Sequence, residues 1–457
     1  MANWAAFPTA LQAELQTGFL EREFEEGLDS ILGYRREALP ETVPARLGEA
    51  ITRTRTSRKN PVTAPLNPGS TSSLDNGLTA TDAALEQYTL TTFEYGDATD
   101  VNLMADLASI ADNMTRVARN NGVQAAQSLE RIARSSIFGA YLGGNTRVRV
   151  DLGSSTTTTC HVDDIRGFTT VLVNGVPTPI SGAHTLSVAE ISTSGSGVTQ
   201  TLVVSAAVAD GTNYSTAPDG ISGVLTFATA TAPVHGDAIV ASNAARVLRP
   251  FGRATTAKLQ GGDVLTLGIL QDATTILKNN AVPPCADGSY HVILDNTSMR
   301  QLFADQDFKI LYAGRYQSSE YQTGDIIRLL DMTFIPTTEA YVQLTSTNTA
   351  NGVTDAVNVT VRRPLVIGAE AMIEGDFEGL DSWLTREGMN NISDVFMIDS
   401  VAHIIRPPLD RLAQWASFAW VWIGGYAIPT DLTATTSIIP TASSALYKRA
   451  VVLETAS

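Results

Sequence analysis

The chain has 457 residues, of which 44% are hydrophobic and 17% charged, and its formal net charge is −16. This length allows two or three domains, and the acidic balance argues against a protein that grips nucleic acid through many Lys and Arg contacts to phosphate. Two cysteines, Cys160 and Cys285, are too few for a disulfide framework or a cysteine-rich zinc site, which fits a reducing compartment.

The N-terminal stretch MANWAAFPTALQAELQTGFLEREFEEG has neither the basic start nor the apolar centre of a signal peptide. The most apolar window, LAQWASFAWVWIGGYAI, is interrupted by Gly424 and Gly425 and is too short to span a bilayer. We therefore expect a protein that is intracellular and soluble when synthesised, with no membrane partner.

Residues 1–50 combine short helical signals, prolines and charges of both signs, which is typical of an arm that lies over a surface. Arg53 and Arg55 then alternate with threonines, the period of a β-strand. A Pro-, Gly- and Ser-rich stretch separates them from a second strand-like segment, YTLTTFEYG. These signals predict an extended β-hairpin over residues 51–95, and composition alone leaves a disordered loop as the alternative.

This hairpin has too few large apolar residues to fold alone, so it needs a surface to lean on, such as a neighbouring subunit. Its basic run could bind nucleic acid or pair with acidic groups of a neighbour in a homo-oligomer. The net charge of −16 favours the second interpretation. The candidates for contacts between subunits are Arg53, Arg55, Arg58 and Lys59.

A long helix is the strongest signal in residues 96–149. Its apolar residues recur at spacings of three and four and form one stripe. Thr99 and Asp100 are suited to cap its start, and Asn120–Asn121–Gly122 is a candidate interruption. A continuous helix over residues 99–142 would be a rod of about 60 Å, which suits an elongated scaffold. The stripe comprises Leu103, Leu107, Ile110, Met114 and Val117, and it resumes at Leu129 and Ile132.

Residues 150–252 differ in composition, with only ten charged residues between positions 151 and 250. Short Val-, Thr- and Leu-rich runs alternate there with Gly, Pro and Asn-Gly turn signals, which predicts a β-sandwich-like or barrel domain. Because the helices on either side read as one other domain, we expect this domain to be an insertion. Residues 253–457 mix helical and strand signals, and SFAWVWIGGYAI is apolar on both faces, as a central strand would be.

The segment TTTTCHVDDIRG concentrates residue types that bind metals and transfer protons. Cys160 and His161 are adjacent, so on a strand they point to opposite faces, and no second histidine follows at ligand spacing. We interpret Cys160 as a half-buried strand residue and DDIRG as a turn. In that turn, Asp163, Asp164 and Arg166 are expected to face solvent or a neighbouring subunit.

Other catalytic patterns are missing from the sequence. No phosphate-binding glycine loop and no GxSxG elbow occurs. The sequence therefore predicts no catalytic residue, no metal ligand and no cofactor site. A metal-dependent hydrolase that uses Cys160, His161 and Asp163 is the alternative.

One long segment resembles a known family. The stretch GSYHVILDNTSMRQLFADQDFKILYAGRYQSSEYQTGDIIRLLDMTFIPTTEA is similar to the central part of major capsid proteins of tailed bacteriophages, particularly the group typified by the coliphage N-four capsid protein. The flanking pieces YTLTTFEYGDATD, PLVIGAEAM and PLDRLAQWASFAWVW resemble the same group in the expected order. Together the resemblance covers about residues 45–149 and 256–430.

The resemblance implies an α+β chain with the Hong Kong 97-type capsid fold. Its parts would be an N-terminal arm, an extended loop, a peripheral domain built on a long spine helix, and an axial α/β domain. The residue ranges that we expect for these parts are 1–50, 51–95, 96–149 and 253–457, and the last also supplies the return strands of the peripheral domain. The β-domain of 150–252 would be an addition to this basic fold.

The implied function is structural and not enzymatic. Such a protein self-assembles into the hexamers and pentamers of an icosahedral head, which encloses double-stranded DNA without sequence-specific binding. Portal and scaffolding proteins, and in some heads a decoration protein, would be its partners. It would be made in the bacterial cytoplasm and end in the virion, and a β-rich phage tail or binding protein is a further alternative.

Overall fold

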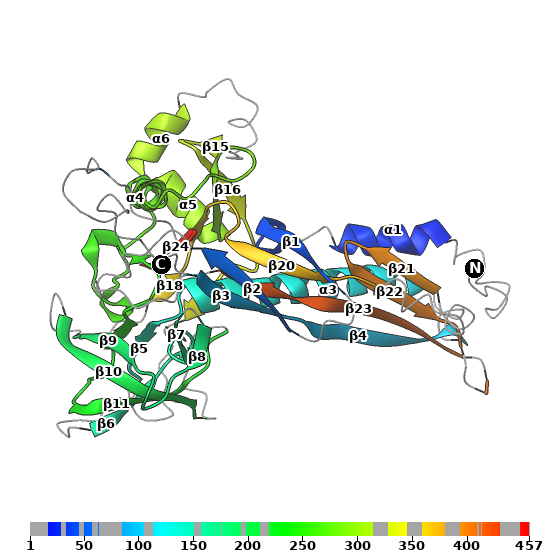
Figure 1. Cartoon of the computed structure of the whole chain (residues 1–457). Helices are drawn as coiled ribbons and strands as arrows, with labels where there is room; N and C mark the ends of the chain where they lie inside the picture. The colour runs from blue at the N-terminus through cyan, green and yellow to red at the C-terminus, as the bar shows by residue number, and fades with distance from the viewer. Residues whose placement is uncertain are drawn as a thin grey trace, which may run out of the picture.

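A computed structural model describes residues 17–28, 33–44, 50–56, 63, 85–104, 113–149, 157–174, 176–192, 198–210, 219–313, 328–344, 359–379, 394–408, 411–412, 414–429 and 448–456. The molecule is elongated, with a broad part on one side and a long arm on the other (Figure 1). Strands outnumber helices among these residues, so the predicted α+β class is confirmed. No helix in the described part is long and apolar enough to cross a membrane.

A six-stranded sheet and two helices form the long arm (Figure 1). Strand β23 (Trp415–Ala427) is central, because it pairs with β4 along one side and with β22 and β20, at different positions, along the other. Helix α1 (Thr17–Leu28) packs with α3 (Asn113–Tyr141), and both contribute to apolar clusters with β23. The other strands are β1 (Ala38–Val43), β4 (Phe93–Asn102), β20 (Met372–Phe377), β21 (Asp394–Ile398) and β22 (Val401–Arg406).

The long helix differs from its prediction at the start. Thr99 and Asp100 lie in β4, which pairs with β23 along its whole length, so they do not cap a helix. Residues 105–112, which include Leu107 and Ile110, lie outside the described residues. Helix α3 runs without interruption through Asn121–Gly122, and its 29 residues span about 43 Å at the usual helical rise.

The predicted hairpin strands are present. Strand β2 (Ala50–Thr56) pairs antiparallel with β3 (Leu85–Thr91). Leu90 is buried with Val43 and Ala427, so the base of the hairpin leans on the sheet of its own chain. The segment between the two strands, apart from residue 63, lies outside the described residues.

The inserted strands form a closed barrel instead of two facing sheets. Their order is β5-β12-β9-β10-β11-β6. The chain just after β5 then bonds to β6, with a bridge between Val148 and Val162 and an Asp163 N–H bond to the Arg147 carbonyl at 2.9 Å. Closure removes exposed strand edges. The strands are β5 (Asn145–Arg147), β6 (Thr157–Val162), β9 (Leu186–Ile191), β10 (Val198–Ala209), β11 (Gly223–Thr231) and β12 (Ala238–Ala241), with a side hairpin of β7 (Thr170–Val173) and β8 (Val176–Pro179).

The remaining part is a mixed sheet with the order β13-β24-β19-β14-β16-β15. One apolar cluster packs helix α4 (Leu267–Asn279) on this sheet. A second cluster packs Ile137 and Phe138 of α3 on the same sheet. Helix α3 therefore serves both the arm and this domain. The strands are β13 (Val247–Leu248), β14 (Tyr290–Leu294), β15 (Arg328–Leu329), β16 (Met332–Pro336), β19 (Leu365–Ile367) and β24 (Ala450–Leu453).

Three helices and a small sheet complete this domain. The helices are α4 (Leu267–Asn279), α5 (Asn296–Ala304) and α6 (Gln306–Ala313). The three-stranded sheet consists of β17 (Val342–Leu344), β18 (Thr360–Arg362) and β25 (Thr455–Ala456). Short 3-10 turns occur at η3 (Arg35–Glu37), η4 (Pro250–Gly252) and η5 (Thr256–Lys258).

Candidate functional site

The Cys160–His161–Asp163 segment does not form a catalytic centre. Cys160 is fully buried in the barrel core, where burial raises the pKa of its thiol to about 12. His161 faces the other way, with its Nδ1 3.3 Å from Asp210 Oδ2. The three side chains do not gather as metal ligands, so the geometry contradicts the hydrolase alternative.

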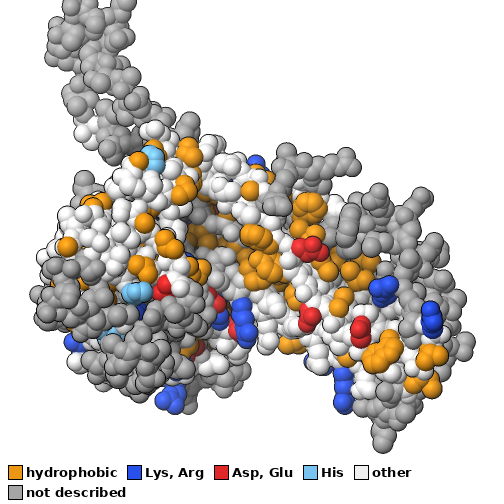
Figure 2. Space-filling view, turned by 90° about the horizontal axis from the view of Figure 1, so that it is seen from below, with side chains coloured by type: hydrophobic (Ala, Val, Ile, Leu, Met, Phe, Trp, Pro, Cys, Tyr) orange, Lys and Arg blue, Asp and Glu red, His pale blue; other side chains and the backbone are white. Residues whose placement is uncertain are grey.

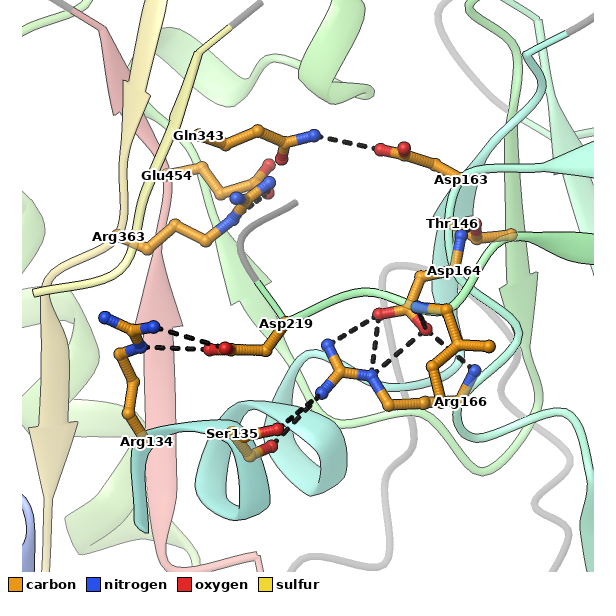
Figure 3. A network of polar contacts seen from close by, with 11 residues as sticks. Arg134, Ser135, Thr146, Asp163, Asp164, Arg166, Asp219, Gln343, Arg363 and Glu454 are labelled. Atoms are coloured by element: carbon orange, nitrogen blue, oxygen red, sulfur yellow. Dashed lines mark hydrogen bonds and ion pairs between the residues drawn. The ribbon is translucent and has the colours of Figure 1, made fainter. Parts of the chain in front are cut away.

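The turn that follows β6 is a polar junction, and the expectation that it faces solvent is wrong. Asp163 is buried, and its Oδ2 accepts a hydrogen bond from Gln343 Nε2 at 2.9 Å (Figure 3). The same oxygen lies 3.4 Å from Arg147 Nη2. Arg166 donates to both carboxylate oxygens of Asp164, with the shortest bond at 2.7 Å. These charges turn inward because the barrel docks on the rest of the chain at this turn.

Helix α3 provides the second side of the junction. Arg166 Nη1 donates to the carbonyl oxygen of Ser135 at 3.2 Å. The neighbouring residue, Arg134, makes a bidentate pair with Asp219 at 2.9 and 3.2 Å (Figure 3). Its Nη1 also donates to the carbonyl oxygen of Glu339 at 2.8 Å. Planar bidentate pairs restrict orientation as well as distance. The helix is thus tied to the barrel and to the segment before β17.

Glu454 occupies the third side and is fully buried. Its carboxylate accepts hydrogen bonds from Arg249 Nε at 2.6 Å, Arg363 Nε at 3.0 Å and Thr256 Oγ1 at 2.8 Å. Burial alone would raise its pKa, but the two guanidinium groups lower the pKa to about 2. A cavity of about 30 Å³ next to these groups is lined by both Asp163 and Glu454.

A separate carboxylate anchors the N-terminal segment to α3. The buried side chain of Glu130 accepts backbone N–H bonds from Gly33 at 2.9 Å, Tyr34 at 2.6 Å and Arg35 at 3.0 Å. Arg35 then pairs with Glu374 of β20 at 2.9 Å. Burial raises the pKa of Glu130 against the opposing effect of these three bonds.

Sequence reasoning did not identify the charged residues of α3 as anchors. Their signal is positional, since Glu130 and Arg134 lie among the buried positions of a helix whose other buried residues include Leu129, Ala133 and Ile137. A charged residue on the apolar face of a helix is rarely buried without a partner. The partners themselves lie 85 to 205 residues away for Arg134.

Among the four basic residues of the hairpin, the structure describes the side chain of Arg53. Arg53 forms an ion pair with Glu41 of β1 in the same chain. The side chain of Arg55, and the whole of Arg58 and Lys59, lie outside the described residues. Their role in contacts between subunits stays a prediction.

Comparison with known proteins gives structural likenesses only. No family model matches the chain, and no curated protein matches it. The capsid of Ralstonia phage GP4 is similar at 11% identity over 92% of this chain and 87% of that chain, with a TM-score of 0.46. The capsid of cyanophage P-SCSP1u is 10% identical over 93% and 88%, with a TM-score of 0.42, and that of cyanophage Pam1 is 9% identical over 90% and 86%, with a TM-score of 0.44. Because these TM-scores are below 0.5, the proposal below rests on the architecture and on the sequence resemblance.

Proposed function

We propose that this chain is a bacteriophage major capsid protein, which assembles into the hexamers and pentamers of an icosahedral head. The observation that carries the proposal is the shared helix α3, which packs on the sheet of the long arm and on the mixed sheet of the broad part. The N-terminal segment with α1, the hairpin of β2 and β3, and the barrel all lie around this helix (Figure 1). This is the set and order of parts that the sequence resemblance implies.

The fixed geometry of the junction supports a mechanical role. The ion pair of Arg134 with Asp219 joins α3 to the barrel, and the hydrogen bond of Gln343 with Asp163 joins β17 to the barrel. These contacts hold the parts of one subunit in a set orientation. A shell protein needs such rigidity, since small errors in subunit shape accumulate over many copies. The residue ranges proposed for the parts are those expected from the sequence, with the barrel of 150–252 as an addition to the basic fold.

The surface also supports assembly with further copies. Figure 2 shows apolar side chains gathered in the middle of one face, where the broad part meets the long arm. Apolar patches on a protein surface commonly mark interfaces. Large apolar residues are also exposed on separate elements, namely Phe93 in β4, Val208 in β10, Phe251 in η4 and Ile310 in α6.

The same proposal includes the partners and the location. Double-stranded DNA is enclosed without sequence-specific binding, which suits a net charge of −16. Portal and scaffolding proteins, with a decoration protein in some heads, are its further partners, and the protein resides in the virion. Arg53, Arg55, Arg58 and Lys59 are proposed to contact a neighbouring subunit.

Light scattering and negative-stain microscopy of the purified chain test this function. Shells or capsomers are the expected result. A monomer that persists at high protein concentration and moderate salt would overturn the proposal. A monomer that binds a host surface component through the barrel would instead support a tail or binding protein.

A further inference from the structure

Three potential metal ligands meet where the N-terminal segment touches the mixed sheet. Glu37 ends η3, His291 lies in β14, and Cys285 lies in the loop before β14. One ligand atom from each lies within 4.8 Å of the other two. The Oε2 atom of Glu37 is 2.6 Å from Nδ1 of His291. All three residues are half-buried.

The donor set suits zinc. Thiolate sulfur, imidazole nitrogen and carboxylate oxygen are its usual ligands, at about 2.0–2.3 Å from the ion, and three protein ligands with one water form a common arrangement. The three donor atoms lie within 4.8 Å of one another, so small side-chain adjustments are needed to place them around one ion. Half-burial leaves one side for the water.

A fourth residue orients the histidine. Asp287 Oδ2 lies 3.1 Å from Nε2 of His291, on the opposite side of the ring from Glu37. At its present angle this contact is an ion pair and not a hydrogen bond, so a small rotation of the ring is needed to form one. A metal-bound histidine commonly donates its other ring N–H to a carboxylate, which fixes the ring. This arrangement leaves Nδ1, the nitrogen next to Glu37, as the ligand atom.

The supporting backbone is well defined on both sides. The loop is closed by the Cys285 N–H bond to the Ser289 carbonyl at 2.9 Å and by the Gly288 N–H bond to the Cys285 carbonyl at 2.8 Å. Gly288 has a φ of +76°, which glycine adopts without strain. On the other side, the three backbone bonds to Glu130 fix the segment that carries Glu37.

We propose that Glu37, Cys285 and His291 bind one zinc ion, with Asp287 as the residue that orients His291. The ion would join the N-terminal segment to strand β14, two parts of the chain 254 residues apart. It would reinforce the subunit at a point outside the polar junction. The inference concerns one folded chain and does not depend on shell assembly.

Zinc binds the thiolate of Cys285 and the unprotonated Nδ1 of His291, because a donor must give up its proton to coordinate a metal ion, and the released protons pass to solvent. Affinity should fall as the pH is lowered, because protons compete for the same two atoms.

The test uses the untagged full chain, dialysed against zinc chloride and then analysed for bound metal. The expected result is about one zinc per chain with an increase in melting temperature. Cobalt in place of zinc should give the near-ultraviolet absorption of a thiolate-to-metal transition. Failure of wild-type protein to retain zinc or to show this absorption would overturn the site.

Substitutions of the proposed ligands test whether the zinc binds at this site. Cys285→Ser and Glu37→Gln should each lose zinc retention and the zinc-dependent rise in melting temperature, while Asp287→Asn should weaken binding by about tenfold or more. Cys160→Ala is the matched control, since it removes the only other cysteine and should still bind. Circular dichroism of the ion-free variants checks that they fold. Undiminished binding by Cys285→Ser, or equal loss in Cys160→Ala, would contradict the proposal.

Discussion

His403 is a buried histidine without a polar partner in the described part of the chain. Its ring stacks on Phe24, with centroids 4.4 Å apart, and neither nitrogen has a hydrogen-bond partner. Burial lowers its pKa from 6.5 to about 4. The unfolded chain therefore binds a proton at a higher pH than the folded chain does.

This difference predicts acid sensitivity of the arm. Stability is complete above about pH 6.5 and falls as the pH is lowered towards 4, with a loss of about 3 kcal/mol. His403→Phe should remove this part of the pH dependence. Urea unfolding followed by tryptophan fluorescence at pH 7 and pH 4.5 measures it. His184→Gln serves as control, and an unchanged pH dependence in His403→Phe would contradict the assignment.

Substitution of Glu454 should reduce the folding stability more than substitution of an exposed ion-pair residue. Glu454→Gln would leave the buried guanidinium groups of Arg249 and Arg363 without their countercharge, which should cost about 3–5 kcal/mol. Thermal and urea unfolding at pH 7 measure the loss. Glu41→Gln is the matched control, because its pair with Arg53 is partly exposed and should contribute less than about 1 kcal/mol.

Glu454 also makes the stability depend on pH, but the cause is its attraction to two arginines, whereas the cause for His403 is burial. The folded pKa of Glu454, about 2, lies below the model-compound value of 4.5. The stabilisation is therefore present above about pH 4.5 and is lost as the pH falls towards 2. Equal stability of wild type and Glu454→Gln at neutral pH would show that the ion pairs are not formed.

Among residues, the sequence predicted the opposite faces of Cys160 and His161 from strand geometry alone. It could not predict that Asp163, Asp164 and Arg166 turn inward, because their partners Gln343 and Ser135 come from distant segments. A polar turn has the same local pattern whether solvent or another part of the chain covers it.

At the scale of elements, the packing of α1 on α3 depends on two glycines. A Cβ added to Gly122 would overlap the carbonyl oxygen of Phe24, and one added to Gly27 would lie 2.6 Å from the carbonyl oxygen of Arg119. The two helix backbones are therefore in direct contact. This explains why Asn121–Gly122 does not interrupt the helix, since Gly122 is required there for close approach.

Gly122→Ala should separate the two helices. Alanine favours a helix by about 1 kcal/mol over glycine, yet the overlap with α1 should produce a net loss of about 1–3 kcal/mol. Hydrogen exchange of α1 should rise together with the loss of stability. Gly268→Ala in α4 is the control, because a Cβ there has open space; a stabilised Gly122→Ala protein would refute the close contact.

The predicted helix start at Thr99 was wrong, because this segment is strand β4 of the sheet. Thr99 and Asp100 have the residue types of a helix cap and precede an apolar stripe, but β4 gains ten paired positions along β23. Such pairing with a distant strand overrides local preference. The second half of the helix was predicted well because its stripe is buried on both the arm and the mixed sheet.

At the scale of the whole molecule, the hairpin leads to a test of assembly. Its base packs on its own chain through Leu90, so removing the segment beyond the base should leave a folded subunit. Deletion of residues 56–72 should therefore abolish shell formation and preserve the circular dichroism spectrum. Shells of normal size from this variant, seen by negative-stain microscopy, would refute a role for the hairpin between subunits.

The sequence by itself determined the α+β class, because periodicity and composition along short stretches decide which elements form. It also predicted strands within residues 150–252, and the structure describes strands β6 to β12 there. The tertiary structure alone decided that the inserted strands close into a barrel, that the charged turn after β6 is an internal junction, and that Glu37 reaches Cys285 and His291. Each of these depends on contacts between segments far apart in the chain. Local pattern specifies which elements form, while the burial of charge between them is decided only when the elements pack.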